Sequence, residues 1–371
     1  MKKTLVMKTP RSVEIAVTGK CNLRCLFCSH FTSAGDTGSD LDTGEWLSFI
    51  DELGSLSVMS VTLSGGEAFV RKDLKEIIEG IVKNSMRFNI LSNATLITDE
   101  MAGFLAQTGR CDGVQVSIDG SCEAIHDSIR GAGSFAGAIQ GIRLLEKHGI
   151  QVSVRVTVNK KNINDLENTA SFLINDLGLS GFSTNAAAFL GLCQVNSDDI
   201  QLSIDDRGLA MKTLVDLREK YPGRVTATAG PLTDADMWSE ILEAVADNDP
   251  PTQGRLSACS GPFSRLAVRS DGVMIPCIQL AHMDLGRINR DSLQKIWQEH
   301  PELAKIRERS EIRLLEFESC SQCSYIEHCT GGCPATAYQF NGHINTPSPD
   351  SCLKTFIEQG GSTSCLDGMI S

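Results

Sequence analysis

The segment Cys21-Asn-Leu-Arg-Cys25-Leu-Phe-Cys28 decides how this chain is interpreted, because it places three cysteines in one short loop. It follows an apolar run, residues 13–17, that is predicted to be a strand. Three thiolates in one loop can bind three irons of a [4Fe–4S] cluster, which ordinarily takes four cysteines. No fourth cysteine follows nearby, so one iron is left for an exogenous ligand. The alternatives are three incidental cysteines and a zinc site, but zinc usually takes four ligands with paired spacing.

Composition and charge restrict the classes of protein that remain. The chain has 371 residues, and no apolar run in it reaches the roughly 18 residues of a membrane span. The segment before residue 13 lacks the apolar core of a signal peptide. A net charge of −12 without a Lys/Arg-rich stripe argues against a nucleic-acid partner. We therefore expect a cytoplasmic protein that binds neither membrane nor nucleic acid.

Cysteine usage supports a metal-binding interpretation. The fourteen cysteines are many for a cytoplasmic chain, where disulfides are rare, so clustered cysteines indicate metal ligands or catalytic groups. Three lie in residues 21–28 and five in residues 320–352, with Cys259 and Cys277 between the two groups.

The first 230 residues alternate strand-like runs with amphipathic, helix-like stretches. The predicted strands are 13–17, 58–64, 88–92, 114–118, 152–158 and 181–187. The predicted helices are 43–53, 73–84, 99–108, 134–148, 164–177 and 205–221. This alternation indicates βαβ units around a parallel sheet, and six units do not complete an eight-fold barrel. The expected fold is α/β, a partial (β/α)6 barrel with its site at the carboxyl ends of the strands.

A breaker-rich stretch at 248–254 marks a change to short hairpins, turns and cysteines. The predicted divisions are a barrel at 1–235, a linker or helix at 236–254, a cysteine-rich domain at 255–357 and a loose tail at 358–371. In the third part, residues 266–269 and 273–275 predict a hairpin that turns at Asp271-Gly272. Bound clusters are expected to help hold this small domain together.

The second cysteine group has a specific spacing. Its pattern is Cys320-x2-Cys323-x5-Cys329-x3-Cys333, then Cys352, preceded by Cys259, Gly272 and Cys277 with four residues between the last two. A zinc ribbon is the alternative for the CxxC pair, but the odd number of cysteines and the interleaved Gly-x4-Cys disfavour it.

Both cysteine groups resemble known family signatures. The segment 21–28, with Phe27 before its last cysteine, resembles the signature of the radical S-adenosylmethionine (SAM) superfamily. The second group, with Gly331-Gly332-Cys333-Pro334, resembles the SPASM domain of peptide-maturase-like enzymes. In the first family SAM chelates the open iron, and an electron from the cluster cleaves its sulfonium. The resemblance implies that the resulting 5′-deoxyadenosyl radical abstracts hydrogen from a substrate, while the protein orients the reactants and excludes water.

The resemblance also implies contacts to SAM. Ser64-Gly65-Gly66-Glu67 follows the second strand, where glycines let the backbone approach a ligand and Glu67 is a candidate acceptor for the SAM amino group. Ser117 and Arg130 are expected to contact the ribose and the carboxylate, since an arginine can grip a carboxylate with forked donors. The alternatives are a plain turn for the glycines and a surface salt bridge for Arg130.

Other candidates are placed by their position after strands. Asn93, Asp119 and Asn159 follow the third, fourth and fifth strands, and each is a predicted cofactor-binding residue. Asn185 and residues 186–191 follow the sixth strand and are expected to border adenine or substrate.

The same resemblance implies two auxiliary [4Fe–4S] clusters, and hence three clusters in all. One would be held by Cys320, Cys323, Cys329 and Cys352, and the other by Cys259, Cys277 and Cys333. The second set is one ligand short. Either its fourth iron stays open to bind a substrate group such as a peptide thiolate, or Cys193 completes it. The open iron is favoured, and a small buried side chain is the further interpretation of Cys193.

The expected substrate is a ribosomally made peptide that gains a thioether or other crosslink, or an oxidised residue. The alternatives are an anaerobic sulfatase-type formylglycine maturase, a small-molecule dehydrogenase or decarboxylase, and an electron-transfer protein without radical chemistry. The missing auxiliary ligand counts against the sulfatase type, and the SAM motifs count against electron transfer alone. The expected partners are a peptide or small-molecule substrate and a reductant such as flavodoxin or ferredoxin. A separate leader-peptide-binding protein is expected where leader recognition is needed, since there is no room for such a domain before residue 13.

Overall fold

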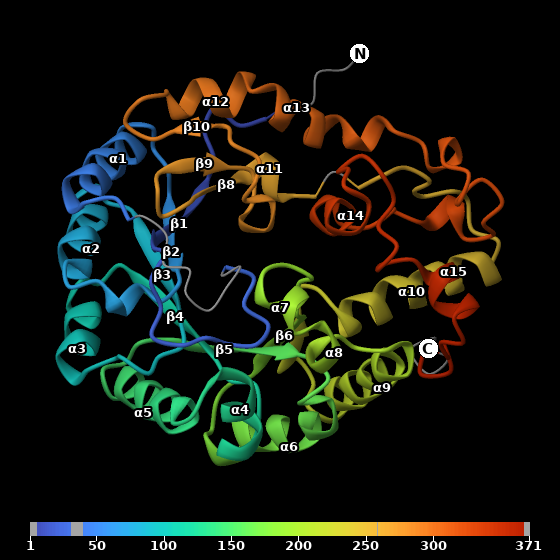
Figure 1. Ribbon diagram of the computed structural model, residues 1–371, viewed down its shortest axis with the longest axis horizontal. Coiled ribbons are helices and arrows are strands. Elements are labelled where there is room, and N and C mark those ends of the chain that lie inside the picture. Colours follow the sequence, from blue (N-terminus) through green and yellow to red (C-terminus); the bar gives the residue numbers. More distant parts are fainter. Residues whose placement is uncertain (1–5, 31–39, 258, 367–371) are drawn as a thin grey trace.

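The computed structural model describes residues 6–30, 40–257 and 259–366, which build one ten-stranded sheet with helices around it (Figure 1). The strands are β1 (Ser12–Thr18), β2 (Ser60–Gly65), β3 (Arg87–Ser92), β4 (Cys111–Ser117), β5 (Val152–Val158), β6 (Phe182–Ala186), β7 (Val225–Ala227), β8 (Arg265–Val268), β9 (Val273–Ile275) and β10 (Gly286–Arg287). The helices of the first half are α1 (Thr43–Ser55), α2 (Leu74–Lys83), α3 (Asp99–Gln107), α4 (Glu123–Arg130), α5 (Ser134–Lys147), α6 (Leu166–Ser171), α7 (Leu192–Val195) and α8 (Ser197–Ile200). Those of the second half are α9 (Ile204–Lys220), α10 (Pro231–Ala246), α11 (Gly261–Ser264), α12 (Leu293–Glu299), α13 (Pro301–Arg307), α14 (Pro334–Asn341) and α15 (Leu353–Glu358).

The order of the strands is that of an open parallel barrel with an added hairpin. The sheet runs β10-β9-β8-β1-β2-β3-β4-β5-β6-β7, and β1 to β7 are all parallel. Strand β8 is parallel to β1, whereas β9 and β10 are antiparallel to their neighbours. In Figure 1, α1 to α6 lie outside the curved sheet, and the orange and red second half of the chain completes the ring.

The sequence-based fold prediction is confirmed, with two additions. The six predicted strands are β1 to β6, and helices connect them as expected. Strand β7 was not predicted, because three residues are too short to show a period. The predicted hairpin is present as β8 and β9, but it continues the barrel sheet through β1 instead of forming a separate sheet. Because β1 and β8 are far apart in the chain, their pairing produces no pattern that the sequence near either strand could reveal.

Alternation along the strands separates a packed outer face from a polar inner face. In β4, Val114 and Val116 are fully buried in the main core, where helix residues such as Ile142 and Leu145 also pack. Successive side chains of a strand point to opposite faces, so Gln115 and Ser117 face the inside of the barrel. The lumen is therefore lined with groups that can bond to a ligand.

The carboxyl-terminal segment packs back onto the barrel. Phe356 of α15 contacts Trp238 of α10, with ring centroids 4.8 Å apart. Leu366, within the predicted tail at 358–371, is fully buried in the main core. Among the described residues, no helix has the length and apolar character to cross a membrane.

Candidate active site

The loop that carries Cys21, Cys25 and Cys28 is held at the carboxyl ends of the strands by backbone hydrogen bonds. Leu26 N–H donates to the carbonyl of Ile129 at the end of α4 (2.9 Å), and Leu192 N–H of α7 donates to the carbonyl of Cys28 (2.9 Å). The side chain of Asn196 donates to the carbonyl of Leu26 (2.9 Å). The end of α4 and the α7–α8 segment thus fix the loop.

Gly65 and Gly66 let this loop lie directly on the end of β2. The N–H of Gly66 donates to the carbonyl of Thr18, and that of Glu67 to the carbonyl of Lys20, each at 2.9 Å. A Cβ on Gly66 would lie 2.2 Å from the Lys20 carbonyl oxygen, and Gly65 has a φ of +133°. The glycines were predicted to admit a ligand, and the structure shows that they first admit the cysteine loop itself.

Glu67 is buried and joins the ends of two strands. Its carboxylate accepts hydrogen bonds from the N–H of Asn93 (2.7 Å), the hydroxyl of Ser92 (2.9 Å) and the N–H of Phe69 (3.2 Å). Burial raises its pKa, while these donors act in the opposite direction. Glu67 therefore positions Asn93, whose side-chain amide reaches Cys21 Sγ (3.9 Å).

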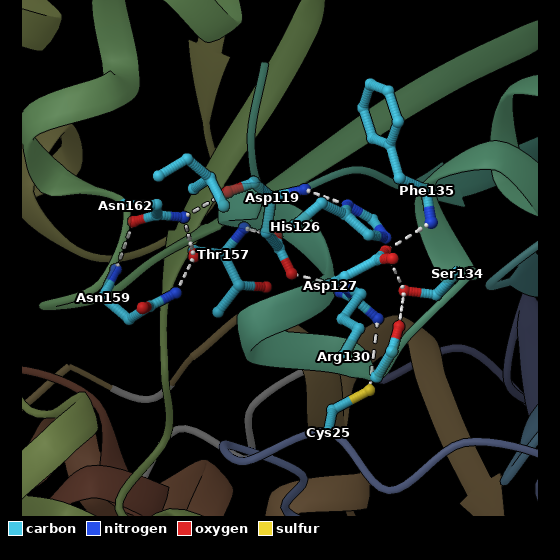
Figure 2. A network of polar contacts seen from close by, with 12 residues as sticks. Cys25, Asp119, His126, Asp127, Arg130, Ser134, Phe135, Thr157, Asn159 and Asn162 are labelled. Atoms are coloured by element: carbon cyan, nitrogen blue, oxygen red, sulfur yellow. Dashed lines mark hydrogen bonds and ion pairs between the residues drawn. The ribbon is translucent and has the colours of Figure 1, made fainter. Parts of the chain in front are cut away.

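Arg130 links the fourth strand to the cysteine loop, as Figure 2 shows. Its Nε donates to Asp119 (2.5 Å), its Nη1 lies 3.6 Å from Cys25 Sγ, and its guanidinium stacks 5.0 Å from the Phe27 ring centroid. Burial alone would lower the pKa of Arg130, but the Asp119 carboxylate and the nearby thiols raise it. Arg130 is thus a buried, paired cation beside the cluster-binding loop, not a surface salt bridge.

Asp119 and Asn159 lie on the far side of Arg130 from the cysteine loop, and neither lines the cavity described below. Asp119 also accepts from the N–H of Thr157 on β5 (2.7 Å). The Asn159 side chain donates to the carbonyl of Thr157 (Figure 2), and it accepts from the N–H of Lys161 within its own turn. Direct contact of these two with SAM stays a prediction, and their placement gives them a positioning role.

A cavity of about 570 Å³ unites the other predicted residues. Its lining includes Cys21, Cys25, Cys28, Gly65, Gly66, Glu67, Asn93, Ser117 and Arg130. The sequence reasoning missed Glu14, which also lines it and whose Oε1 accepts from Ser64 (2.8 Å). The available signal was a carboxylate within the apolar strand 12–18. On the other side, Arg269, Asp271 and Ile278 place the carboxyl-terminal region at the same cavity.

The residues of this loop fit an iron–sulfur cluster better than a single ion. Burial raises the pKa of Cys25 to about 11, and charges on Cys28 and Cys21 would act on it. Within the described ranges, no three Cys, His, Asp or Glu side chains are grouped to hold one metal ion. A cubane offers a separate iron to each thiolate, so its ligands need not converge on one point.

The set of four auxiliary cysteines is brought together by tertiary contacts. Burial raises the pKa of Cys329 to about 11, and Cys352, Cys320 and Cys323 are the thiols whose charges add to this shift. Cys352 is the N-cap residue of α15, so the carboxyl-terminal segment brings in the member that is most distant in sequence. The predicted grouping of these four residues therefore corresponds to one neighbourhood in the structure.

The set of three auxiliary cysteines also forms one neighbourhood, without Cys193. Burial raises the pKa of Cys277 to about 11, and charges on Cys333 and Cys259 contribute. Cys193 is fully buried in α7, and burial alone raises its pKa to about 11, with no thiol acting on it. The structure thus favours the interpretation of Cys193 as a small core residue.

Arg309 is a further residue of the three-cysteine neighbourhood that the sequence did not reveal. It is fully buried and donates to four backbone carbonyls, those of Ser257 (2.5 Å), Gly332 (3.0 Å), Ile344 (2.6 Å) and Thr346 (2.7 Å). These bonds tie the segment before Cys259 to the segment before Cys333. A single arginine in a charged stretch carries no sequence signal for this role.

Comparison with known families agrees with both cysteine groups. Residues 15–173 match the radical SAM superfamily, and residues 259–324 match the SPASM iron–sulfur cluster-binding domain. The chain is a radical SAM enzyme with a SPASM domain. The family resemblance and the enzyme class inferred from the sequence are confirmed.

Relatives of this radical SAM enzyme span almost the whole chain. An AdoMet-dependent heme synthase of Methanosarcina barkeri is 27% identical over 344 residues, covering 92% of this chain and 95% of that protein. A PqqA peptide cyclase of Granulibacter bethesdensis is 25% identical over 355 residues, covering 94% and 88%. The structure of Streptococcus suis SuiB bound to its precursor peptide SuiA superposes with a TM-score of 0.71 at 16% identity, covering 94% of this chain and 77% of SuiB. That likeness supports the fold.

Proposed function

We propose that this enzyme cleaves SAM at the cluster held by Cys21, Cys25 and Cys28, and that the resulting radical abstracts hydrogen from a peptide substrate. The observation that carries the proposal is the single cavity shared by these cysteines, the strand-end residues and the SPASM side. A reduced cluster supplies the electron that breaks the sulfonium bond of SAM.

The chain's own residues would bind and orient SAM. Arg130 presents a fixed cation beside Cys25, suited to the SAM carboxylate. Asn93 and Ser117 line the cavity as polar groups for the amino group and the ribose. Gly65, Gly66 and Glu67 lie on the same wall, and Asp119 and Asn159 hold Arg130 and the β5 turn behind it.

The two auxiliary neighbourhoods are proposed to hold one [4Fe–4S] cluster each, which would bring the total to three. They would transfer electrons or anchor the substrate, and an external reductant such as flavodoxin or ferredoxin would supply electrons. The set of Cys259, Cys277 and Cys333 is proposed to keep an open iron, because Cys193 is fully buried in α7, where the neighbouring Leu192 N–H bonds to the carbonyl of Cys28. Cysteine-rich sites of this kind are consistent with a cytoplasmic enzyme.

The decisive experiment is SAM cleavage by reduced, reconstituted protein, followed as 5′-deoxyadenosine. Formation of 5′-deoxyadenosine is expected, and it should fail when Cys25 is replaced by alanine. If the reduced wild-type protein, with its iron and sulfide content verified, forms none, the proposed function is wrong.

Peptide modification is favoured over other substrates by the relatives that are named as peptide cyclases and maturases. A short peptide gene beside this one would provide the substrate, and a mass change in that peptide would test its modification. A separate leader-binding protein would be sought in the same neighbourhood.

A tetrapyrrole substrate is the second candidate, because other relatives are named as heme and Fe-coproporphyrin III synthases. This corresponds to the small-molecule decarboxylase alternative. Incubation with Fe-coproporphyrin III and loss of carbon dioxide from it would favour this candidate over peptide modification.

A further inference from the structure

The inner wall of the barrel contains an arginine, Arg155, that forms no ion pair with a carboxylate of the described part of the chain. Arg155 lies on β5 between Val154 and Val156, which pack in the outer core, so Arg155 faces the lumen. Its Nη2 donates to Gln115 Oε1 (3.0 Å), and its Nη1 donates to Thr228 Oγ1. Among the described residues, no carboxylate forms an ion pair with it, and burial alone shifts its pKa, which is lowered.

Three unsatisfied polar atoms gather at this point of the wall. Arg155 Nε is buried without a hydrogen-bond partner, as are Ser183 Oγ and Asn185 Oδ1 on the neighbouring strand β6. Arg155 is paired with Ser183 in the register of the two strands, and Asn185 follows two residues later on the same face. Buried polar atoms are nearly always hydrogen-bonded, so a cluster of three indicates a missing group.

The charge of Arg155 determines what that group can be. Arg130 pairs with Asp119, and Arg207 pairs with Asp234 and Asp350. The buried Arg307 and Arg309 instead donate to backbone carbonyl oxygens. Arg155 has neither kind of partner among the described residues, since it donates only to the side chains of Gln115 and Thr228. A water molecule could bond to the three atoms but would leave the guanidinium charge uncompensated. A carboxylate would accept from Arg155 and Ser183, and the amide of Asn185 can turn its NH2 group toward the same oxygen.

This patch adjoins the SAM cavity. Arg155 is also paired with Ser117 in the register of β4 and β5, and Ser117 lines the cavity. A substrate that occupies the cavity could therefore extend one strand further along the wall.

We propose that Arg155, Ser183 and Asn185 form a subsite that binds a carboxylate of the substrate. This deepens the proposed function, since it assumes that the substrate enters the barrel. The carboxylate could belong to an Asp or Glu side chain or the carboxyl terminus of a peptide, or to a tetrapyrrole propionate. Both sources share the chemistry that the subsite recognises.

The first test uses acetate as the carboxylate probe on the reconstituted holoenzyme. Thermal unfolding is compared in sodium acetate and in sodium chloride at equal ionic strength, for the wild type, Arg155→Met, Arg155→Gln and Arg207→Gln. Acetate stabilises proteins generally, so the difference between variants is the measurement. The wild type and Arg207→Gln should gain Tm in acetate by about 1–3 °C more than either Arg155 variant. An equal gain in all four proteins would overturn the proposal.

The same series, without acetate, separates a binding role from a structural one. Arg207→Gln should lower Tm, because it leaves Asp234 buried without its cation. Either Arg155 substitution should leave Tm unchanged or raise it, because it removes a half-buried cation that forms no ion pair with a described carboxylate. A loss of Tm in both Arg155 variants as large as that in Arg207→Gln would show a structural role instead.

A second test distinguishes the source of the carboxylate. Binding of Fe-coproporphyrin III is compared with binding of a synthetic peptide that contains one Asp and of its Asn counterpart. The probe that binds the wild type should bind Arg155→Gln at least about tenfold more weakly. Equal binding to both proteins would overturn the proposal, and if neither probe binds, the acetate series decides. Cleavage of SAM without substrate should persist in Arg155→Gln. If the wild-type protein does not cleave SAM either, that result contradicts the proposed function and leaves the carboxylate subsite to the binding tests.

Discussion

The radical-cluster loop and the three-cysteine auxiliary set both offer three thiols, but they are built in opposite ways. Cys21, Cys25 and Cys28 come from one loop, which barrel backbone groups hold from several sides. Cys259, Cys277 and Cys333 come from distant segments that meet only in the folded chain. The first site is a local motif placed on a scaffold, whereas the second exists only after separate segments of the chain have packed together.

Each of the two sites has a buried arginine, and the two arginines differ in their hydrogen-bond partners. Arg130 has a carboxylate partner, Asp119, and turns one nitrogen toward Cys25. Arg309 donates to backbone carbonyls, and burial lowers its pKa, to about 10, although charges on the thiols of Cys333 and Cys259 act in the opposite direction. Arg130 therefore has a nitrogen placed beside the cysteine loop, where a ligand can bind. Arg309 instead joins several loops through their carbonyls, and the nearby thiols are the groups that can compensate its charge.

The largest effect is expected from Cys25→Ala. It removes one of three local ligands, so the first cluster should be lost and formation of 5′-deoxyadenosine should cease. The auxiliary clusters should remain, since their cysteines lie in another region. Iron analysis and electron paramagnetic resonance would measure this, and loss of all iron would show that the two regions assemble together.

A large but smaller effect is expected from Arg130→Gln. The Asp119 carboxylate would be left buried without its cation, which costs about 3–5 kcal/mol in the free energy of unfolding. Cleavage of SAM should fall by roughly 100-fold as the carboxylate grip is lost. Asp119→Asn is the matched variant and should retain more activity, because its amide oxygen can still accept from Thr157. Equal activity in both variants would contradict a direct role for Arg130.

Cys259→Ala is the reciprocal test, because it removes a ligand of the auxiliary set and leaves the radical-cluster loop intact. Iron content should fall by about one cluster, and substrate modification should stop, while SAM cleavage at the first cluster persists. The ratio of iron to protein, measured beside that of Cys25→Ala, provides the check. An unchanged ratio would mean that Cys259 is not a ligand.

The smallest effect is expected from Cys193→Ala. The side chain is fully buried among core residues, so the substitution should lower the free energy of unfolding by only about 1 kcal/mol. Iron content should stay at the wild-type value. A loss of iron comparable to that of Cys259→Ala would restore Cys193 as the fourth ligand.

Much of the candidate site was predictable because strand ends and cysteine spacing are local properties. Cys21, Gly66, Asn93, Ser117 and Arg130 all line one cavity, as the motif positions suggested. Asp119 and Asn159 were expected at the same place but lie behind it, because a strand end presents some side chains to the lumen and others to the next turn.

What escaped prediction depends on non-local pairing. Glu14 and Arg155 face the lumen because their neighbours on each strand pack outward, and only the assembled barrel shows which polar groups have partners. The sequence predicted the hairpin of β8 and β9 with its turn at Asp271-Gly272, but it did not indicate that this hairpin extends the barrel sheet through β1.

The sequence by itself determined the chemistry of this protein: the spacing of its cysteines and the alternation of strands and helices, both of which depend on neighbours a few residues apart. Tertiary structure alone decided which cysteines meet, that Cys193 is buried in α7, and that no described carboxylate forms an ion pair with Arg155. The physical reason is that charge compensation and ligand geometry depend on distances in space, and the chain brings those groups together only when its core closes.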